Sequence, residues 1–289
     1  MLSPRRVLLS PGPAATLACL YEATAAKPGN VHPRRGFEDL SYADFVASAI
    51  VIGPVFDRSH EMGVGQTVLD AVRVTRAAVG TNTNLGTLLL LAPLSAVPMQ
   101  QPLADGIGAV LAGLTADDTK HVYEAIRLSC ASGLGRAEQA DVSSNPPPGL
   151  NLVEAMRLAA DRDCVARQYT NNFADVFDGT AAWIADALAR ELPLSEAIVW
   201  AHIRQMAQCP DSLIGRKCGP QVAAEAARRA EAVLASEKQG QSAFRKALND
   251  FDGWLREDGH RRNPGTTADL VAAGLFVLLR EGRLDWTSW

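Results

Sequence analysis

Apolar residues recur at helical spacing along nearly the whole chain, and this periodicity constrains the fold more than any other feature. Val64, Val68, Val72 and Val79 trace one helix face, and the same spacing returns in 199–206. Alternating apolar and polar residues between turn signals, the pattern of a strand, are almost absent. We therefore predict an all-α fold, a multi-helix globular bundle of about a dozen helices.

Residues that start and stop helices divide this pattern. Gly80 is placed to close one helix, Ser41 to cap another, and Pro264 to start the last strong one. The stretch 143–149 contains three consecutive prolines and cannot be helical. We predict a single helical domain over residues 1–289 with an irregular Pro-rich loop at 143–149.

Composition excludes several classes of protein. The 289 residues are 47% hydrophobic and 21% charged, with a net charge of -4, as expected for a folded globular protein and not for a general nucleic-acid binder. The longest apolar stretch, Leu85 to Val97, is interrupted and shorter than the about 20 residues that a bilayer requires. Prolines 11 and 13 cut the signal-like start too early. We expect a cytoplasmic protein without membrane or nucleic-acid partners; an oligomer is possible.

The cysteines predict neither a disulfide framework nor a structural zinc site. There are five, an odd number, and none belongs to a C-x-x-C pair. We expect buried or unreactive thiols in a reducing cytosol.

The first of four polar clusters joins a late helical carboxylate to a loop with a cation, a glycine turn, an amide and an imidazole. Its residues are Glu22, Lys27, Gly29, Asn30 and His32. This mixture suits a pocket for a phosphorylated ligand. The ordinary alternative is a helix C-terminus stabilised by a lysine and followed by a Pro/Gly turn.

The second cluster places four hydrogen-bonding side chains between two apolar helices. It consists of Thr81, Asn82, Thr83 and Asn84, followed by Gly86. Asn82 or Thr83 would cap the next helix, and a helix N-terminus with hydroxyls is a natural anion site. A cap needs only one such residue, but a well-capped helix–helix turn remains the alternative.

The third and fourth clusters lie in 211–219 and 263–270. A solvated charged turn is the usual meaning of the third. In the fourth, Asp269 sits early in a helix that the apolar pattern places in the core. A buried carboxylate is costly unless it is paired or binds a metal, although a solvent-facing first-turn aspartate is the alternative. The candidate residues here are Asp211, Arg216, Lys217, Asn263, Gly265, Thr266 and Asp269.

The common nucleotide-binding and hydrolase motifs are missing from the sequence. In order and approximate spacing, however, the four clusters resemble the triphosphoribosyl-dephospho-CoA synthases, which build the prosthetic-group precursor of citrate lyase and malonate decarboxylase. The resemblance runs from about Leu17 to Leu279. It rests on Lys27-Pro28-Gly29 after Glu22, on Gly80-Thr81-Asn82-Thr83 with Gly86, on Asp211, and on Pro264-Gly265 with Ala268-Asp269-Leu270.

Some positions depart from the family pattern. The family typically has an Asn-Thr-His-Lys-Gly run where this chain has Asn84 and Leu85 in place of the histidine and lysine. His32 replaces an aspartate that usually follows Lys-Pro-Gly. The chain resembles a divergent branch, whose acceptor we expect to differ from dephospho-CoA or to bind more weakly. The cations that could compensate are Arg34, Arg35 and Lys217.

The resemblance implies an all-α transferase that moves the triphosphoribosyl group of ATP onto the 2′-hydroxyl of 3′-dephospho-CoA and releases adenine. Such a reaction needs a carboxylate base, negative groups near an oxocarbenium-like ribose, and Mg²⁺ with backbone N–H groups on the triphosphate. The candidates for base and metal ligands, which the sequence does not separate, are Glu22, Asp211 and Asp269. The candidates for phosphate contacts are Lys27, Arg216, Lys217 and the turn 81–83.

Two other functions remain open from the sequence. One is a related ribose-phosphate transferase in another cofactor pathway, and the other is a non-catalytic helical nucleotide-binding or scaffold protein. The scaffold would leave the polar clusters scattered. An enzyme requires the loops 27–36, 81–86, 211–217 and 263–269 to converge on one cleft.

Overall fold

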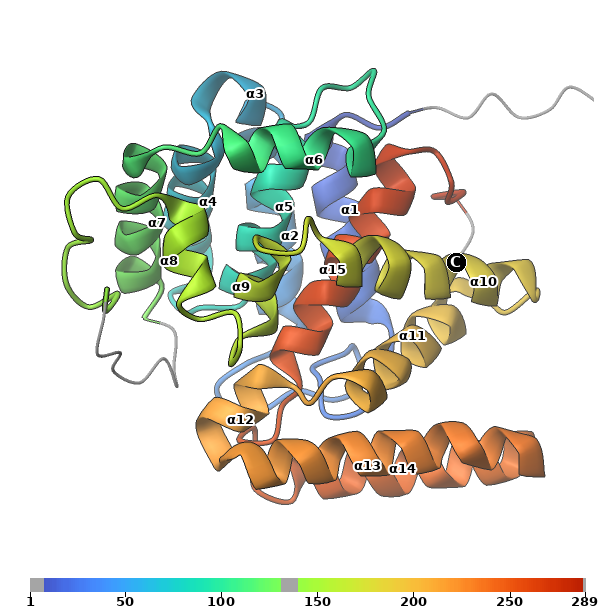
Figure 1. Ribbon diagram of the computed structural model, residues 1–289. Coiled ribbons are helices and arrows are strands. Elements are labelled where there is room, and N and C mark those ends of the chain that lie inside the picture. The colour runs from blue at the N-terminus through green and yellow to red at the C-terminus, as the bar shows by residue number, and fades with distance from the viewer. Residues whose placement is uncertain (1–7, 131–139, 288–289) are drawn as a thin grey trace, which may run out of the picture.

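The computed structural model describes residues 8–130 and 140–287, and these residues form helices joined by short loops (Figure 1). Two isolated β-bridges, His32 with Arg35 and Phe37 with Leu40, are the only extended pairings in these two ranges. The predicted all-α class is confirmed. The elements are α1 (Pro11–Thr24), α2 (Tyr42–Phe56), α3 (Ser59–Met62), α4 (Val64–Val79), α5 (Leu85–Ala96), α6 (Leu103–Ala112), α7 (Ala116–Ser129), α8 (Leu152–Arg157), α9 (Cys164–Gln168), η1 (Asp175–Ala181), α10 (Ala182–Ala189), α11 (Leu194–Gln208), α12 (Ser212–Cys218), α13 (Pro220–Ser236), η2 (Glu237–Gln239), α14 (Gln241–Arg256) and α15 (Gly265–Arg280).

Fifteen α-helices lie in the described ranges, against about a dozen expected. The excess comes from α3, α8, α9 and α12, which span only four to seven residues. Helices this short do not complete two turns, so their sequences carry no apolar repeat that could be recognised.

The helix α15 is the central element, as its apolar sequence predicts. Every residue from Leu270 to Arg280 is buried, and Figure 1 shows α15 running through the middle of the bundle beside α1 and α5. Asp211, directly before α12, binds Thr267 near the N-terminus of α15, and Gly29 of the loop after α1 binds Asn263 just before it. The burial of α15 therefore fixes the direction in which Asp269, near its N-terminal end, faces.

The helix α5 contains Pro93 within its length. A proline inside a helix lacks the N–H that would bond the carbonyl four residues earlier. That carbonyl belongs to Leu89, and the hydroxyl of Tyr169 donates to it over 2.6 Å instead. Tyr169 on the C-terminal side of α9 thereby replaces the lost backbone bond and ties α9 to α5.

Most helix boundaries follow the predicted signals. Ser41 forms a capping box with Asp44 at the start of α2, and Gly80 ends α4 in a left-handed conformation (φ 73°). The stretch 143–149 is non-helical, as its prolines require. The start of the first helix differs from the pattern: prolines 11 and 13 would be expected to precede it, but they lie inside the first turn of α1. Their missing N–H groups cost no helical hydrogen bond there.

The apolar residues form two clusters. The larger cluster surrounds α15, and the smaller one joins α11 to the antiparallel α13 and α14, which form a separate layer in Figure 1. Ile198 and Ala201 of α11 belong to the larger cluster, and Ile203 and Met206 to the smaller. A single domain over the whole chain stays a prediction, which this sharing of α11 favours.

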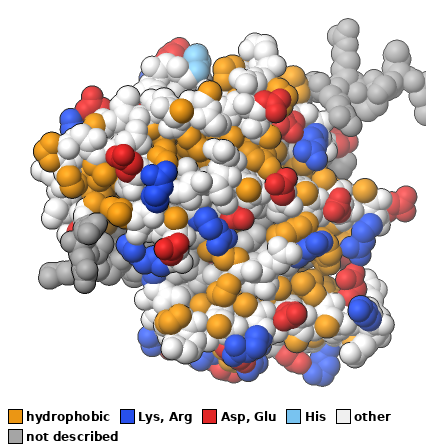
Figure 2. Space-filling model, viewed as in Figure 1, with side chains coloured by type: hydrophobic (Ala, Val, Ile, Leu, Met, Phe, Trp, Pro, Cys, Tyr) orange, Lys and Arg blue, Asp and Glu red, His pale blue; other side chains and the backbone are white. Residues whose placement is uncertain are grey.

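Within the described ranges, no helix combines the length and apolar character needed to cross a membrane. All five cysteines carry free thiols, as expected from their number and spacing. On the face shown in Figure 2, acidic and basic side chains are interspersed over the surface.

Candidate active site

A cleft of about 610 Å³ lies where several helix ends meet. All four segments that the sequence singles out contribute to its wall, so the loops converge as an enzyme requires. The predicted residues that line it are Glu22, Asn30, Thr81, Asn82, Thr83, Asn84, Gly86, Arg216, Lys217, Asn263, Gly265, Thr266 and Asp269.

Asp269 is the fifth residue of α15 and lines the cleft. The hydroxyl of Thr87 donates to its Oδ1 over 2.7 Å. Burial, joined by the negative charges of Glu22 and Asp211, raises the pKa of Asp269 from 3.8 to about 8. The carboxyl can therefore exchange a proton near neutral pH, which is the property of a general acid or base.

Gly86 is needed at its position because Asp269 packs directly against it. A Cβ on residue 86 would lie 2.0 Å from Oδ2 and 2.6 Å from Cγ of Asp269. The glycine in the second cluster thus provides the space for a carboxylate on a helix 180 residues further along the chain.

Glu22, on α1, is the second carboxylate of the cleft. Its Oε1 lies 2.8 Å from Nζ of Lys27, which also donates to the backbone carbonyls of Glu22 and Ala25. Lys27 is fully buried and does not line the cleft. The expected contact between Lys27 and a phosphate is therefore wrong. The ammonium instead neutralises the charge of Glu22 and binds backbone carbonyls at the C-terminal end of α1.

Asp211 also differs from expectation, because it lies behind the cleft wall. Its Oδ1 accepts the N–H groups of Leu213 and Ile214 at 2.9 and 3.0 Å, which caps α12. Its Oδ2 accepts the N–H and hydroxyl of Thr267 at 2.7 and 2.8 Å, which caps α15. Four hydrogen bonds engage both oxygens, so Asp211 joins the N-termini of two helices and does not face a ligand.

Two asparagines offer unpaired hydrogen-bonding atoms to the cleft. Asn30 and Asn84 are only 6% and 8% exposed, and Oδ1 of Asn30 and Nδ2 of Asn84 have no protein partner. Buried polar atoms almost always have a partner, so these two are free to bind a ligand.

The turn before α5 is organised by its own side chains. The N-cap of α5 is Asn84 and not Asn82 or Thr83 as predicted, and its side chain makes no capping bond; Oδ1 of Asn82 instead accepts the N–H of Leu85 at 3.1 Å. The hydroxyls of Thr83 and Ser48 are 2.7 Å apart, which links the turn to α2. The other backbone N–H groups in the first turn of α5 lie at a helix N-terminus, a position that favours the binding of anions.

Gly29 and His32 do not line the cleft either. The N–H of Gly29 donates to Oδ1 of Asp252 over 2.7 Å, and its φ of 74° is one that glycine adopts most readily. The pKa of His32 is lowered by partial burial and by the nearby charge of Arg256. Both residues help attach the first loop to α14.

Of the three cations expected to compensate for the missing lysine, only Lys217 lines the cleft. Arg35 pairs with Asp252 at 2.6 Å, and Arg34 is exposed elsewhere. Burial lowers the pKa of Lys217. Arg216, another cleft residue, forms an ion pair with Asp163.

Sequence reasoning missed a group of polar residues that complete the wall. They come from segments without a recognisable motif: the loop before α2, α2 itself, the connection between α8 and α9, and the loop between α14 and α15. These residues are Asp39, Ser48, Arg162, Asp163 and His260.

The expected three-carboxylate metal site is not formed. Among residues 8–130 and 140–287, no group of three or more histidine, cysteine or acidic side chains is arranged to hold a metal. Glu22 and Asp269 remain as two oxygen donors facing one cleft. This set still fits Mg²⁺, which is usually held by one or two carboxylates together with substrate phosphates.

An all-helical scaffold whose polar loops meet in one cleft, with carboxylates, amides and cations, defines an enzyme for a phosphorylated small molecule. The comparisons with known proteins identify which one. The model of the family described as ATP:dephospho-CoA triphosphoribosyl transferase matches residues 9–288. The chain therefore belongs to this family and is a triphosphoribosyl-dephospho-CoA synthase-like transferase.

A solved structure agrees with this assignment. The crystal structure of a candidate triphosphoribosyl-dephospho-CoA synthase from Archaeoglobus fulgidus superposes with a TM-score of 0.61 at 25% sequence identity, covering 82% of this chain and 99% of that one. Comparison with curated proteins gave no match.

Proposed function

We propose that the cleft binds ATP and dephospho-CoA and that Asp269 accepts the proton of the attacking 2′-hydroxyl. The C1′–N9 bond of ATP breaks, its electron pair leaves with adenine, and the acceptor oxygen bonds to C1′. The observation that carries this role is the position of Asp269. Its carboxyl lines the cleft and accepts a hydrogen bond from Thr87, and burial raises its pKa toward the working pH, where proton transfer is most efficient.

Glu22 has a different role in this proposal. Its Oε1 pairs with Nζ of Lys27, and the residue lines the cleft. A negative group beside the ribose stabilises an oxocarbenium-like centre, as carboxylates do in glycoside hydrolysis. Glu22 is also the carboxylate that would hold Mg²⁺, and that ion would neutralise charge on the triphosphate.

The phosphates fit the basic and N–H-rich side of the cleft. Lys217 and Arg216 of α12 supply cations, and the N-terminus of α5 supplies N–H groups behind the turn 81–84. Apolar residues of α7 to α9, including Val122, Ile126 and Met156, also line the cleft, and they suit an adenine ring or a pantetheine chain.

The direct test is incubation with magnesium, ATP and dephospho-CoA, followed by mass spectrometry of the products. We expect free adenine and an acceptor carrying the triphosphoribosyl group. Asp269→Asn should lose most turnover, while Asp252→Asn, outside the cleft, serves as a matched control. Adenine release without modification of dephospho-CoA would mean that the enzyme uses a different acceptor. Asn84 and Leu85, which replace the histidine and lysine usual in the family, favour such a difference.

The convergence of the polar loops argues against a non-catalytic scaffold. Glu22, Thr83 and Asp269 line the same cleft, and Asp211 binds the first turn of the helix that carries Asp269. A scaffold would have no reason to bring a carboxyl of raised pKa and two unpaired amides together.

A further inference from the structure

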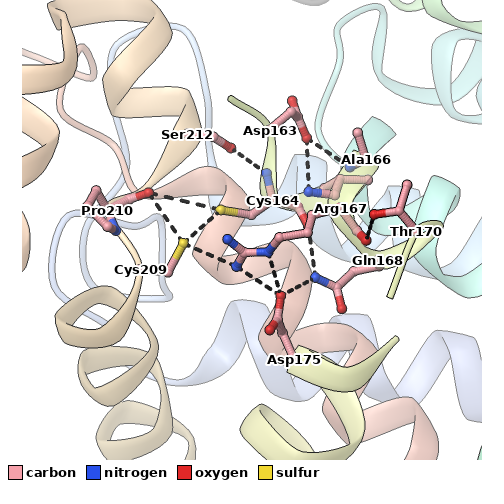
Figure 3. A network of polar contacts seen from close by, with 11 residues as sticks. Asp163, Cys164, Ala166, Arg167, Gln168, Thr170, Asp175, Cys209, Pro210 and Ser212 are labelled. Atoms are coloured by element: carbon pink, nitrogen blue, oxygen red, sulfur yellow. Dashed lines mark hydrogen bonds and ion pairs between the residues drawn. The ribbon is translucent and has the colours of Figure 1, made fainter. Parts of the chain in front are cut away.

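Two cysteines from distant parts of the chain meet behind the wall of the cleft. Cys164 is the first residue of α9, and Cys209 follows the last residue of α11. Their sulfur atoms are 3.0 Å apart (Figure 3). A disulfide has an S–S distance of about 2.05 Å, so the pair needs an approach of only about 1 Å to become bonded.

The surroundings of the two sulfurs are unequal. Nη2 of Arg167 donates to Sγ of Cys209 over 3.3 Å, and the same guanidinium is held by Asp175 at 2.8–2.9 Å (Figure 3). Gln168 donates to the same oxygen of Asp175. The arginine is thus fixed in place, with one N–H directed at a sulfur.

This arrangement stabilises a thiolate on Cys209. The hydrogen bond from Cys164, followed by the charge of Arg167, lowers the pKa of Cys209. The same hydrogen bond and burial raise the pKa of Cys164. Cys209 is partly exposed and Cys164 is buried, so an oxidant reaches the thiolate first and finds a thiol in contact behind it.

We propose that Cys164 and Cys209 are a reversible dithiol–disulfide pair that responds to peroxide. The Cys209 thiolate attacks one peroxide oxygen, the O–O bond breaks, and Cys209 becomes a sulfenic acid, while the departing hydroxide takes up the proton that the thiol had lost and leaves as water. The sulfur of Cys164 then attacks the sulfenic sulfur, the S–S bond forms, and the hydroxyl leaves as a second water with the proton of Cys164. Two thiols and one hydrogen peroxide give one disulfide and two waters, so peroxide takes the two electrons.

The pair is connected to the cleft through its neighbours. The N–H of Cys164 donates to Ser212, whose hydroxyl donates to Thr266 in the cleft wall. Asp163, next to Cys164, pairs with the cleft residue Arg216. Drawing the sulfurs together would therefore shift the start of α9 against α12, and nucleotide affinity is the property we expect to change.

The test uses the full chain, reduced and then treated with hydrogen peroxide, blocked with an alkylating reagent and digested without reductant. We expect one linked peptide pair joining Cys164 to Cys209, two hydrogen masses lighter than the sum, which dithiothreitol separates. Cys164→Ser and Cys209→Ser should each abolish it. Cys218→Ser, at a sulfur that contacts the carbonyl of Arg261 instead, should leave it unchanged.

The digest of the oxidised wild-type chain shows by itself which cysteines are linked, so the test does not depend on whether the substituted chains fold. Linkage of any other cysteine pair, or overoxidation of Cys209 to the sulfinic acid without linkage, would overturn the proposal. Titration with ATP in the two states measures the effect on the cleft. Equal affinities would overturn the coupling to α12, whereas a change of severalfold that dithiothreitol reverses would support it.

Discussion

Substituting Gly86 by alanine should separate catalysis from stability in this enzyme. The added Cβ would lie 2.0 Å from Oδ2 of Asp269, whereas side-chain carbons essentially never come within 3.0 Å of such an atom. The carboxylate must therefore move by about 1 Å or rotate away. Its hydrogen bond from Thr87, at 2.7 Å, holds it in the present position, so movement weakens that bond too.

The two consequences have different sizes. A misplacement of about 1 Å in a reacting group costs on the order of a hundredfold in rate. Weakening a hydrogen bond to a charged group costs about 1.5–3 kcal/mol in stability. Replacing a helical glycine by alanine raises the free energy of unfolding by up to about 1 kcal/mol. We expect Gly86→Ala to lose about a hundredfold in kcat for adenine release while the free energy of unfolding falls by no more than about 2 kcal/mol.

The matched control is Gly253→Ala on α14. A Cβ there meets no atom within 4 Å, so this variant should gain up to about 1 kcal/mol and keep its kcat. Urea unfolding and steady-state adenine release measure both properties. A Gly86→Ala enzyme with wild-type kcat would refute the reasoning, since Asp269 would then move without consequence.

The remaining contacts lead to four further predictions. Glu22→Gln should remove most of the rise in melting temperature that magnesium-ATP produces, because Glu22 is the carboxylate that would hold the ion; an unchanged rise would place the ion elsewhere. A carboxyl whose pKa rises from 3.8 to about 8 on folding stabilises the chain fully below about pH 4 and loses this contribution as the pH rises through 8, so the stability of wild type relative to Asp269→Asn should fall over that interval, measured by urea unfolding. Asp211→Ala should leave four donors unpaired and lower the free energy of unfolding by about 3–5 kcal/mol in the same assay; a loss under 1 kcal/mol would contradict its role as a double cap. Lys217→Met should weaken ATP binding about tenfold to a hundredfold in calorimetry, while Arg34→Met should not change it; equal effects would place the phosphates elsewhere.

The fold was largely predictable because its signals are local. An apolar face, a glycine at the end of a helix or a serine before its start can be recognised within a few residues, and Ser41 and Gly80 act as their sequence context indicates. The short helices α8, α9 and α12 could not be predicted, because they depend on tertiary neighbours. Tyr169, which repairs the gap left by Pro93, shows that such a neighbour can be about 80 residues away.

The candidate site was predictable only as a set of segments, because the role of each side chain depends on which neighbours it meets. Asp211 and Asp269 both lie at helix starts beside small polar residues, and the sequence gives no reason to separate them. Packing separates them. Both oxygens of Asp211 accept hydrogen bonds from four donors at the junction of α12 and α15, whereas Asp269 contacts the hydroxyl of Thr87 and Gly86 and lies near the charge of Glu22. A carboxylate like Asp211, with both oxygens bonded, has a structural role, and one like Asp269, with fewer partners and a negative charge nearby, can exchange a proton. The same argument applies to the cations, since Lys27 is spent on Glu22 while Lys217 reaches the cleft. Hydrogen-bond capacity left over after folding, and not residue type, therefore decides which polar residues of this family scaffold can act on a substrate.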